Sequence, residues 1–161
     1  MAIWQFKVAL LPQRWLDAGG AIASFFDEEG HRTAVAWESA DASVVERRIS
    51  NVLPQHTSWS SKLLLWGSEE TDDIQLWSEA GKIRSLVVRF DLRRPNRPLF
   101  EAIIAAAHDL QLAILDLEHK RAVAGDVKSL LAAAAESSAA HFVTDPRGLI
   151  ARVASERGRA T

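Results

Sequence analysis

Hydrophobic and polar residues alternate in two well-separated stretches of the chain, a pattern typical of strands with one face in the core. In IWQFKVALLP, residues 3–12, the even-numbered positions from Trp4 to Leu10 are apolar, while Gln5 and Lys7 point to the other face. Pro12 ends this strand. In SLVVRFDLR, residues 85–93, the apolar face carries Leu86, Val88, Phe90 and Leu92.

The second stretch belongs to a longer series of extended segments. SSKLLLWG, residues 60–67, is short and apolar. Residues 72–93 contain two strands around Glu79-Ala80-Gly81-Lys82, a hairpin turn with glycine at the strained position. LAILDLEHKRAVA, residues 112–124, opens with too little alternation for an exposed edge and predicts a central strand. TAVAW, residues 33–37, is a further short strand candidate, preceded by a turn at DEEG, residues 27–30.

Four other segments have the three-to-four-residue apolar spacing of helices. Residues 39–53 end at Pro54, and residues 97–110 place Pro98 in the first turn, where its missing N–H is not needed. Asp126 caps a helix over residues 127–142, and Asp145 followed by Pro146 begins another over residues 146–157. Strands in hairpin order with helices between and after them favour an α+β fold. We therefore expect one domain over residues 1–157 with a frayed tail at 158–161, a mostly antiparallel sheet of five or six strands, helices packed on one face and two C-terminal helices.

Bulk composition narrows the function classes. The 161 residues are 48% hydrophobic and 25% charged, and the formal net charge is −2. This balance gives no global attraction to nucleic acid or to an anionic membrane. The absence of cysteine excludes disulfides and thiolate chemistry and fits a reducing compartment. With no basic leader and no long apolar span, we expect a cytoplasmic protein that does not bind membranes.

Searches for catalytic and metal motifs find none. The chain has no glycine-rich phosphate loop and no G-x-S-x-G elbow. Its five histidines have no second ligand at metal spacing, so we expect no metal and no cofactor. His141 lies one helical turn from Ser137 and Ser138, but helical serines more often tighten a helix contact than act in catalysis.

The charged stripe Arg89, Asp91 and Arg93 is the strongest candidate for a site. Period two places all three on one face of the strand, and an Asp between two Arg residues is held ionised. Asp116 and Glu118, on one face of the next predicted strand, could join them. Solvated charge pairs on a wet sheet face are one interpretation; the other is a forked cationic surface that binds a partner's carboxylate or phosphate.

Six tryptophans in so short a chain are the second anomaly. Trp4 is expected on the core face of its strand, and Trp59, Trp66 and Trp77 gather around the hairpin region. Tryptophan is enriched at the centres of protein interfaces. The loop GSEETDD, residues 67–73, places four acids beside them, a plausible rim for a basic partner. The predicted partner-binding residues are Trp66, Trp77, Glu69, Glu70, Asp72, Asp73, Arg89, Asp91 and Arg93.

Several ordered segments also resemble those of a known group. The segments are IWQF and LLP near the start, then WSSKLLLWG, VVRFDLR and ESSAAHFVTDPRGLI; the resemblance extends over most of the chain and is weakest between Asp17 and Glu38. This set resembles a family of small single-domain bacterial hypothetical proteins without an established activity. By class, the resemblance implies an immunity partner of a secreted toxin or another accessory binding protein, and it assigns no functional residue.

Three functions therefore remain as hypotheses. The favoured one is a non-catalytic protein-binding module, in particular an immunity protein that neutralises a bacterial toxin. The alternative is a small hydrolase or transferase with its site near Asp91 and a neighbouring arginine. Nucleic-acid binding through Arg84, Arg89, Arg93, Arg94 and Arg97 is disfavoured by the charge balance. The sequence leaves the oligomeric state open between monomer and homodimer.

Overall fold

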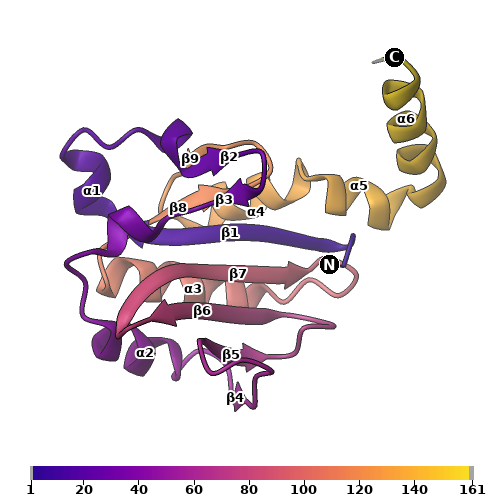
Figure 1. The fold of residues 1–161 in the computed structure, drawn as a ribbon. Coiled ribbons are helices and arrows are strands. Elements are labelled where there is room, and N and C mark those ends of the chain that lie inside the picture. Colours follow the sequence, from indigo (N-terminus) through magenta and orange to yellow (C-terminus); the bar gives the residue numbers. More distant parts are fainter. Residues whose placement is uncertain (1, 160–161) are drawn as a thin grey trace.

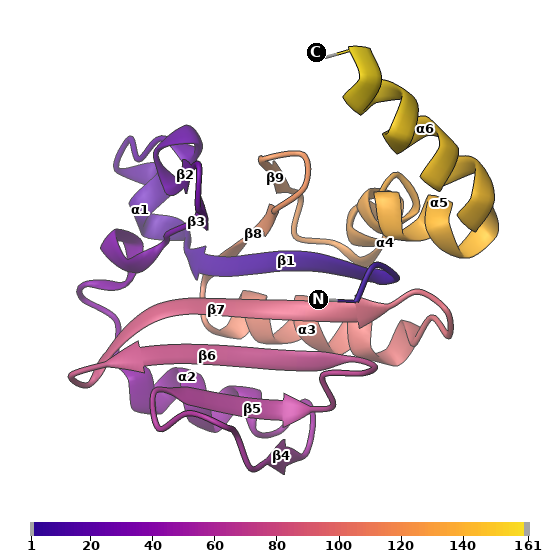
Figure 2. The same cartoon turned by 45° about the vertical axis from the view of Figure 1, so that its right-hand side comes forward.

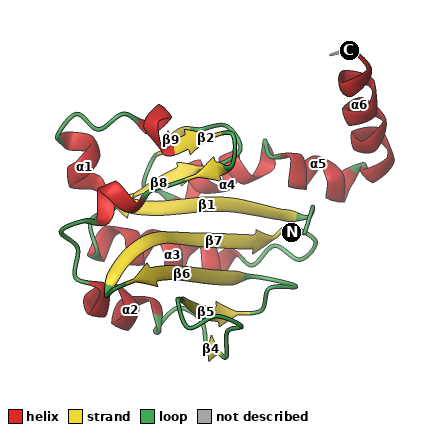
Figure 3. Ribbon diagram, in the orientation of Figure 1, coloured by secondary structure: helices red, strands yellow, loops and turns green. Residues whose placement is uncertain are grey.

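An antiparallel sheet of seven strands organises the molecule (Figures 1 and 3). The computed structural model describes residues 2–159. Along the sheet the order is β4-β5-β6-β7-β1-β8-β9. The strands are β1 (Gln5–Pro12), β4 (Gln55–His56), β5 (Leu63–Gly67), β6 (Asp73–Glu79), β7 (Lys82–Asp91), β8 (Leu112–Asp116) and β9 (Arg121–Val123). The α+β class expected from the sequence is confirmed, with more strands than the five or six expected.

The extra strands come from segments that the sequence pattern joined or misassigned. Residues 112–124 form a hairpin of β8 and β9 rather than one strand, with Lys120 at φ 53° in the turn. The DEEG turn is confirmed and joins a second, two-stranded sheet of β2 (Phe26–Asp27) and β3 (Gly30–His31). TAVAW is not a strand, because Ala34–Trp37 form the 3-10 helix η2.

Helices α2 (Ala42–Ile49), α3 (Arg97–Asp109) and α4 (Val127–Ala135) lie behind the sheet in Figure 1. The side chains of Asp41, Asn96 and Asp126 cap them by accepting first-turn N–H groups. Along the chain, α1 (Gln13–Asp17) and η1 (Ile22–Phe25) follow β1 and precede the small sheet. No helix within residues 2–159 has the length and apolar character needed to cross a membrane.

The predicted helix over residues 127–142 is two helices. It breaks after Ala135, and Ser137 starts α5 (Ser138–Thr144) by accepting a hydrogen bond from the Ala140 N–H. The last helix, α6 (Pro146–Arg159), begins as predicted, with the Asp145 carboxylate accepting from the Gly148 N–H at 3.0 Å. It projects away from the sheet (Figure 2). The predicted frayed tail falls partly on α6, and its residues 160–161 lie outside the described part.

The core lies between the sheet and helices α2, α3 and α4. Leu86, Val88 and Phe90 are fully buried, and Leu92 nearly so, which confirms the predicted inward face of β7. Cross-strand pairing places Val88 beside Val8 of β1 and Ile74 of β6, so each strand contributes its apolar face to the same layer.

The opposite face of the sheet is only partly polar. Leu11 and Leu115 on that face are buried, and the segment from residue 13 to 41 adds Trp15, Phe25 and Trp37 to the same apolar cluster. η2 crosses β7 and β1, and the Thr33 hydroxyl donates to the Arg84 carbonyl at 3.1 Å. The polar part of this face is therefore the stretch over β6, β7 and the start of β1, because Leu63 and Leu65 of β5 are buried on this face. We call this stretch the open face.

Candidate functional site

Arg89 does not stand free on the open face. The β6–β7 register places Asp73 directly opposite Arg89. Arg89 Nε donates to Asp73 Oδ1 at 2.6 Å, and Nη2 donates to Oδ2, so the pair is bidentate. This hydrogen bonding raises the pKa of Arg89, and the Asp73 side chain is 0% exposed. The pair therefore joins two strands, and Asp73 offers no surface to a partner.

Asp91 is likewise occupied by its own chain. Its carboxylate accepts from Arg93 Nε at 2.9 Å, from Arg93 Nη2 at 2.8 Å and from the Arg93 backbone N–H at 3.0 Å. Hydrogen bonding from Arg93 lowers the pKa of the buried Asp91 carboxyl. The stripe is therefore neither a wet row of solvated charges nor a free cationic fork.

Arg93 has two further contacts at the end of β7. Its guanidinium lies over the Trp4 ring, 4.0 Å from the centroid, and donates to the Glu70 carbonyl at 2.8 Å. Trp4 precedes β1 and is partly exposed under Arg93, so its expected place in the core is wrong. The arginine thereby holds the N-terminal segment and the acidic loop together.

The acidic loop presents only two of its four acids outward. Asp72 is held inward by the Asp91 N–H, which donates to its carboxylate at 2.7 Å, and burial raises the pKa of Asp72. Asp73 is buried against Arg89. Glu69 and Glu70 remain exposed. The Glu69 carboxylate accepts from the Trp59 indole N–H at 3.2 Å and from Gln75 at 3.3 Å.

The tryptophans near the hairpin fall into two groups. Trp66 is fully buried in the core, where its indole N–H donates to the Ser50 hydroxyl at 3.2 Å. It cannot contact a partner, so we remove it from the predicted surface. Trp77 lies half-buried on the open face, and Trp59 packs edge-on against it with ring centroids 5.3 Å apart. Trp59 is 70% exposed.

A groove of about 1070 Å³ runs across the open face. Strands β1, β6 and β7 form its floor, and its walls come from β3 and η2, from the segment carrying Trp59 and Lys62, and from the start of α5. Its lining includes the side chains of Lys7, His31, Trp59, Trp77 and Arg89. Sequence reasoning placed Lys7 on this face and Trp59 in this region, but selected neither as a site residue.

Most charged side chains that line the groove are already paired. Glu79 accepts from Lys62 at 2.7 Å and from Arg84 at 3.1 Å. Lys7 differs, because no hydrogen bond or ion pair joins its ammonium to another side chain within residues 2–159. Burial lowers the pKa of Lys7, and the charge of Arg89 lowers it further, against a smaller opposite effect of Asp73.

His31 responds to the same environment. It reaches the groove from β3. Burial first, and then the charge of Lys7, lower the pKa of His31 below its ordinary value of 6.5. The imidazole is therefore neutral at pH 7 and can offer one donor and one acceptor to a ligand.

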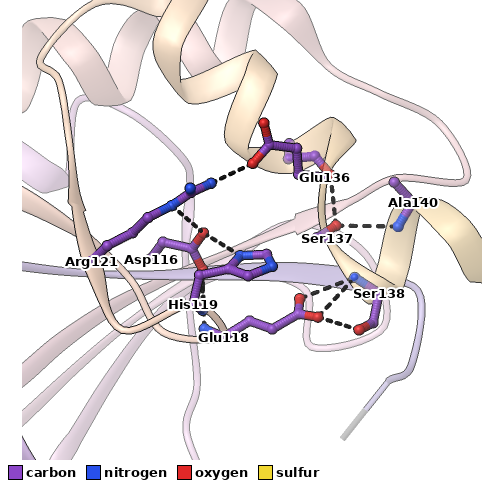
Figure 4. Close-up of polar contacts among 9 residues, drawn as sticks. Asp116, Glu118, His119, Arg121, Glu136, Ser137, Ser138 and Ala140 are labelled. Atoms are coloured by element: carbon purple, nitrogen blue, oxygen red, sulfur yellow. Dashed lines mark hydrogen bonds and ion pairs between the residues drawn. The ribbon is translucent and has the colours of Figure 1, made fainter. Parts of the chain in front are cut away.

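A second polar cluster surrounds Asp116 and the start of α5 (Figure 4). The buried Asp116 carboxylate accepts from the backbone N–H groups of Glu118 and His119 and lies 2.8 Å from His119 Nδ1. Asp116 pairs with Val8, so it lies on the core face and cannot join Arg89 as the sequence suggested. Glu118 lies in the β8–β9 turn and accepts from the Ser138 N–H at 3.0 Å.

The geometry of this second cluster is that of turn and helix capping. The Ser138 hydroxyl donates to Glu118, and the Ser137 hydroxyl donates to the Ala134 carbonyl at 2.6 Å (Figure 4). Both hydroxyls are thus directed away from His119 and His141 as hydrogen-bond donors. Arg121 pairs with Glu136 and closes the cluster on the side of α4. The histidine–serine spacing in the sequence reflects the start of α5.

The enzyme alternative receives no geometric support at Asp91. Its carboxylate accepts three hydrogen bonds from Arg93, and it does not line the groove. Among residues 2–159, no three histidine or acidic side chains are grouped so that they could hold a metal ion.

Comparisons with protein-family models, with curated proteins and with solved structures return no match for this chain. The resemblance to small bacterial proteins therefore stays a prediction from the quoted segments.

Proposed function

We propose that the protein is a non-catalytic binding module that recognises a partner protein in the groove on its open face. The observation that carries the proposal is the Trp59–Trp77 pair, with Trp59 70% exposed and both rings lining the groove. A rigid aromatic pair beside a polar rim has the chemistry of an interface centre. Glu69 and the Lys62–Glu79–Arg84 group supply that rim.

Recognition of nucleic acid is less well supported. Arg84, Arg89, Arg93 and Arg97 each pair with a carboxylate of the same chain. Arginines held in this way have little charge left to neutralise phosphates.

A photo-crosslinking experiment tests the proposal. A benzophenone amino acid replaces Trp59 in one variant and Val44 in the control, because Val44 is 46% exposed on α2, away from the open face. In cells of the natural host we expect one discrete protein to crosslink from position 59 and not from position 44. The same products from both positions, or none from position 59, would contradict the proposal.

An immunity role is a specific form of this proposal, favoured by the family resemblance alone. It predicts that co-expression restores growth of cells producing a toxin encoded beside this gene, and that Trp59→Ala weakens the protection. If Trp59→Ala protects cells as well as the unaltered protein does, the immunity role does not depend on the groove.

A further inference from the structure

Among the described residues of the groove floor, Lys7 is the one cation that has no hydrogen bond or ion pair with a carboxylate. On the same row of the sheet, β6 contributes Asp73, β7 contributes Arg89 and β1 contributes Lys7. Asp73 gives both carboxylate oxygens to Arg89. The row therefore holds two cations and one anion, with Lys7 half-buried at its end. A second carboxylate, supplied by a ligand, would neutralise the remaining positive charge of this row.

The neighbours of Lys7 favour a single negative charge. Glu69 and Glu118 also line the groove, so a doubly charged phosphate would meet repulsion that a carboxylate meets less strongly. His31 stands beside Lys7 as a neutral hydrogen-bonding group at pH 7. One ammonium and one imidazole are a suitable donor pair for one carboxylate.

The aromatic pair lies at a distance that suits a short extended peptide. Trp77 is four residues along β6 from Asp73, and β6 is two strands away from β1. With ~4.8 Å between strands and ~3.3 Å per residue, the diagonal from Lys7 to Trp77 is about 16 Å. In an extended segment, side chains four residues apart lie on the same face with their Cα atoms about 13 Å apart, and the lengths of the two side chains cover the remaining distance.

We propose that the groove binds an extended segment of the partner protein, which places a carboxylate side chain on Lys7 and an apolar side chain, four residues along the segment, on the Trp59–Trp77 pair. This inference rests on the proposed function and names the chemistry of the partner. The ion pair between the carboxylate and Lys7 holds one end of the segment. Packing of the apolar side chain on Trp59 and Trp77 holds the other end.

Matched peptides provide the test. The probe is an end-capped pentapeptide with glutamate first, leucine fifth and serine or threonine between; the control replaces glutamate by glutamine. Binding is followed by amide chemical shifts of the ¹⁵N-labelled protein. We expect the glutamate peptide to bind about fivefold more tightly, the scale of one partly buried charged hydrogen bond, with shifts around both Lys7 and Trp77.

Variants then assign the charge preference to Lys7. Lys7→Gln should abolish the difference between the two peptides, and Lys7→Arg should retain it. Lys82→Gln is the matched control, because Lys82 is an exposed lysine on the hairpin turn that does not line the groove. In a peptide with adjacent glutamate and leucine, the leucine cannot reach the Trp59–Trp77 pair while the glutamate contacts Lys7. This peptide should therefore bind more weakly.

Several results would overturn the inference. These are equal affinity for both peptides, no detectable binding of either, or a preference that survives Lys7→Gln. Self-association that disappears in Lys7→Gln would make a second copy of the chain the occupant. Crosslinking from position 59 does not depend on Lys7, so a specific crosslink without peptide selectivity would refute this inference and leave the proposed function standing.

Discussion

At the residue scale, the buried Asp73–Arg89 pair shows how a charged stripe becomes structural. Asp73 has no exposed side-chain surface, and its two oxygens receive the Arg89 fork. Removing one partner of a buried pair leaves the other charge uncompensated, which costs far more than losing a surface pair.

We therefore expect Arg89→Ala to lower the free energy of unfolding by about 3 kcal/mol. The control is Arg84→Ala, whose exposed pair with Glu79 should cost less than about 1 kcal/mol. Urea unfolding followed by tryptophan fluorescence measures both. The double variant Arg89→Ala with Asp73→Ala should recover part of the loss, and a double variant as unstable as the sum of the single ones would refute the coupling.

Alternation along residues 85–93 predicted which side chains share a face, because the strand period is fixed by backbone geometry. It could not predict that Asp73 meets Arg89. That pairing depends on the β6–β7 register, which the turn and the irregularity between Trp77 and Ser78 set. The sequence thus assigned Asp73, Arg89 and Asp91 to a partner surface, whereas the structure pairs them with residues of the same chain.

At the element scale, the β6–β7 turn combines a good hairpin position with an unfavourable residue. Ala80 has φ 51° and Gly81 has φ 74°, so both central residues occupy the left-handed region. Asparagine and then glycine suit these two positions best, while alanine pays a steric cost there.

Ala80→Asn should therefore raise the free energy of unfolding by about 0.5 kcal/mol, and Gly81→Ala should lower it by about 1 kcal/mol. No atom lies within 4 Å of an added Gly81 Cβ, so backbone strain alone would account for the loss. Thermal unfolding of both variants measures the effects. A lower free energy of unfolding in Ala80→Asn, or a higher one in Gly81→Ala, would contradict the assigned turn geometry.

The helix with one continuous apolar stripe was predicted well, while short segments and the break in the predicted helix over residues 127–142 were not. The helix from Arg97 to Asp109 was recovered with its Pro98 start because three turns carry one apolar stripe. TAVAW has too few residues to separate a strand from a 3-10 turn. Residues 112–124 hide a hairpin whose turn is stabilised by Asp116, a capping contact that alternation does not encode.

At the scale of the whole molecule, one apolar cluster joins the sheet, the three covering helices and the segment from residue 13 to 41. Helix α6 stands apart from it. Its contacts are mainly with α5, and only Leu149 is buried, among the α6 side chains that the structure describes.

We expect urea unfolding to be a single transition, coincident by tryptophan fluorescence and by far-UV circular dichroism. A variant that ends at Asp145 should unfold with the same cooperativity and lose no more than about 2 kcal/mol, the scale of burying one leucine. Two separated transitions in the full chain would show that the cluster is divided, and a truncated chain that fails to fold would show that α6 is part of the core.

The two outer strands of the main sheet are very short: β4 has two residues and β9 has three. Long unpaired borders invite another chain to add a strand and seed fibrous aggregates, and brief ones do not. The protein should therefore stay dispersed at high concentration. We therefore expect a partner to bind to a face of the sheet and not to add a strand to its edge.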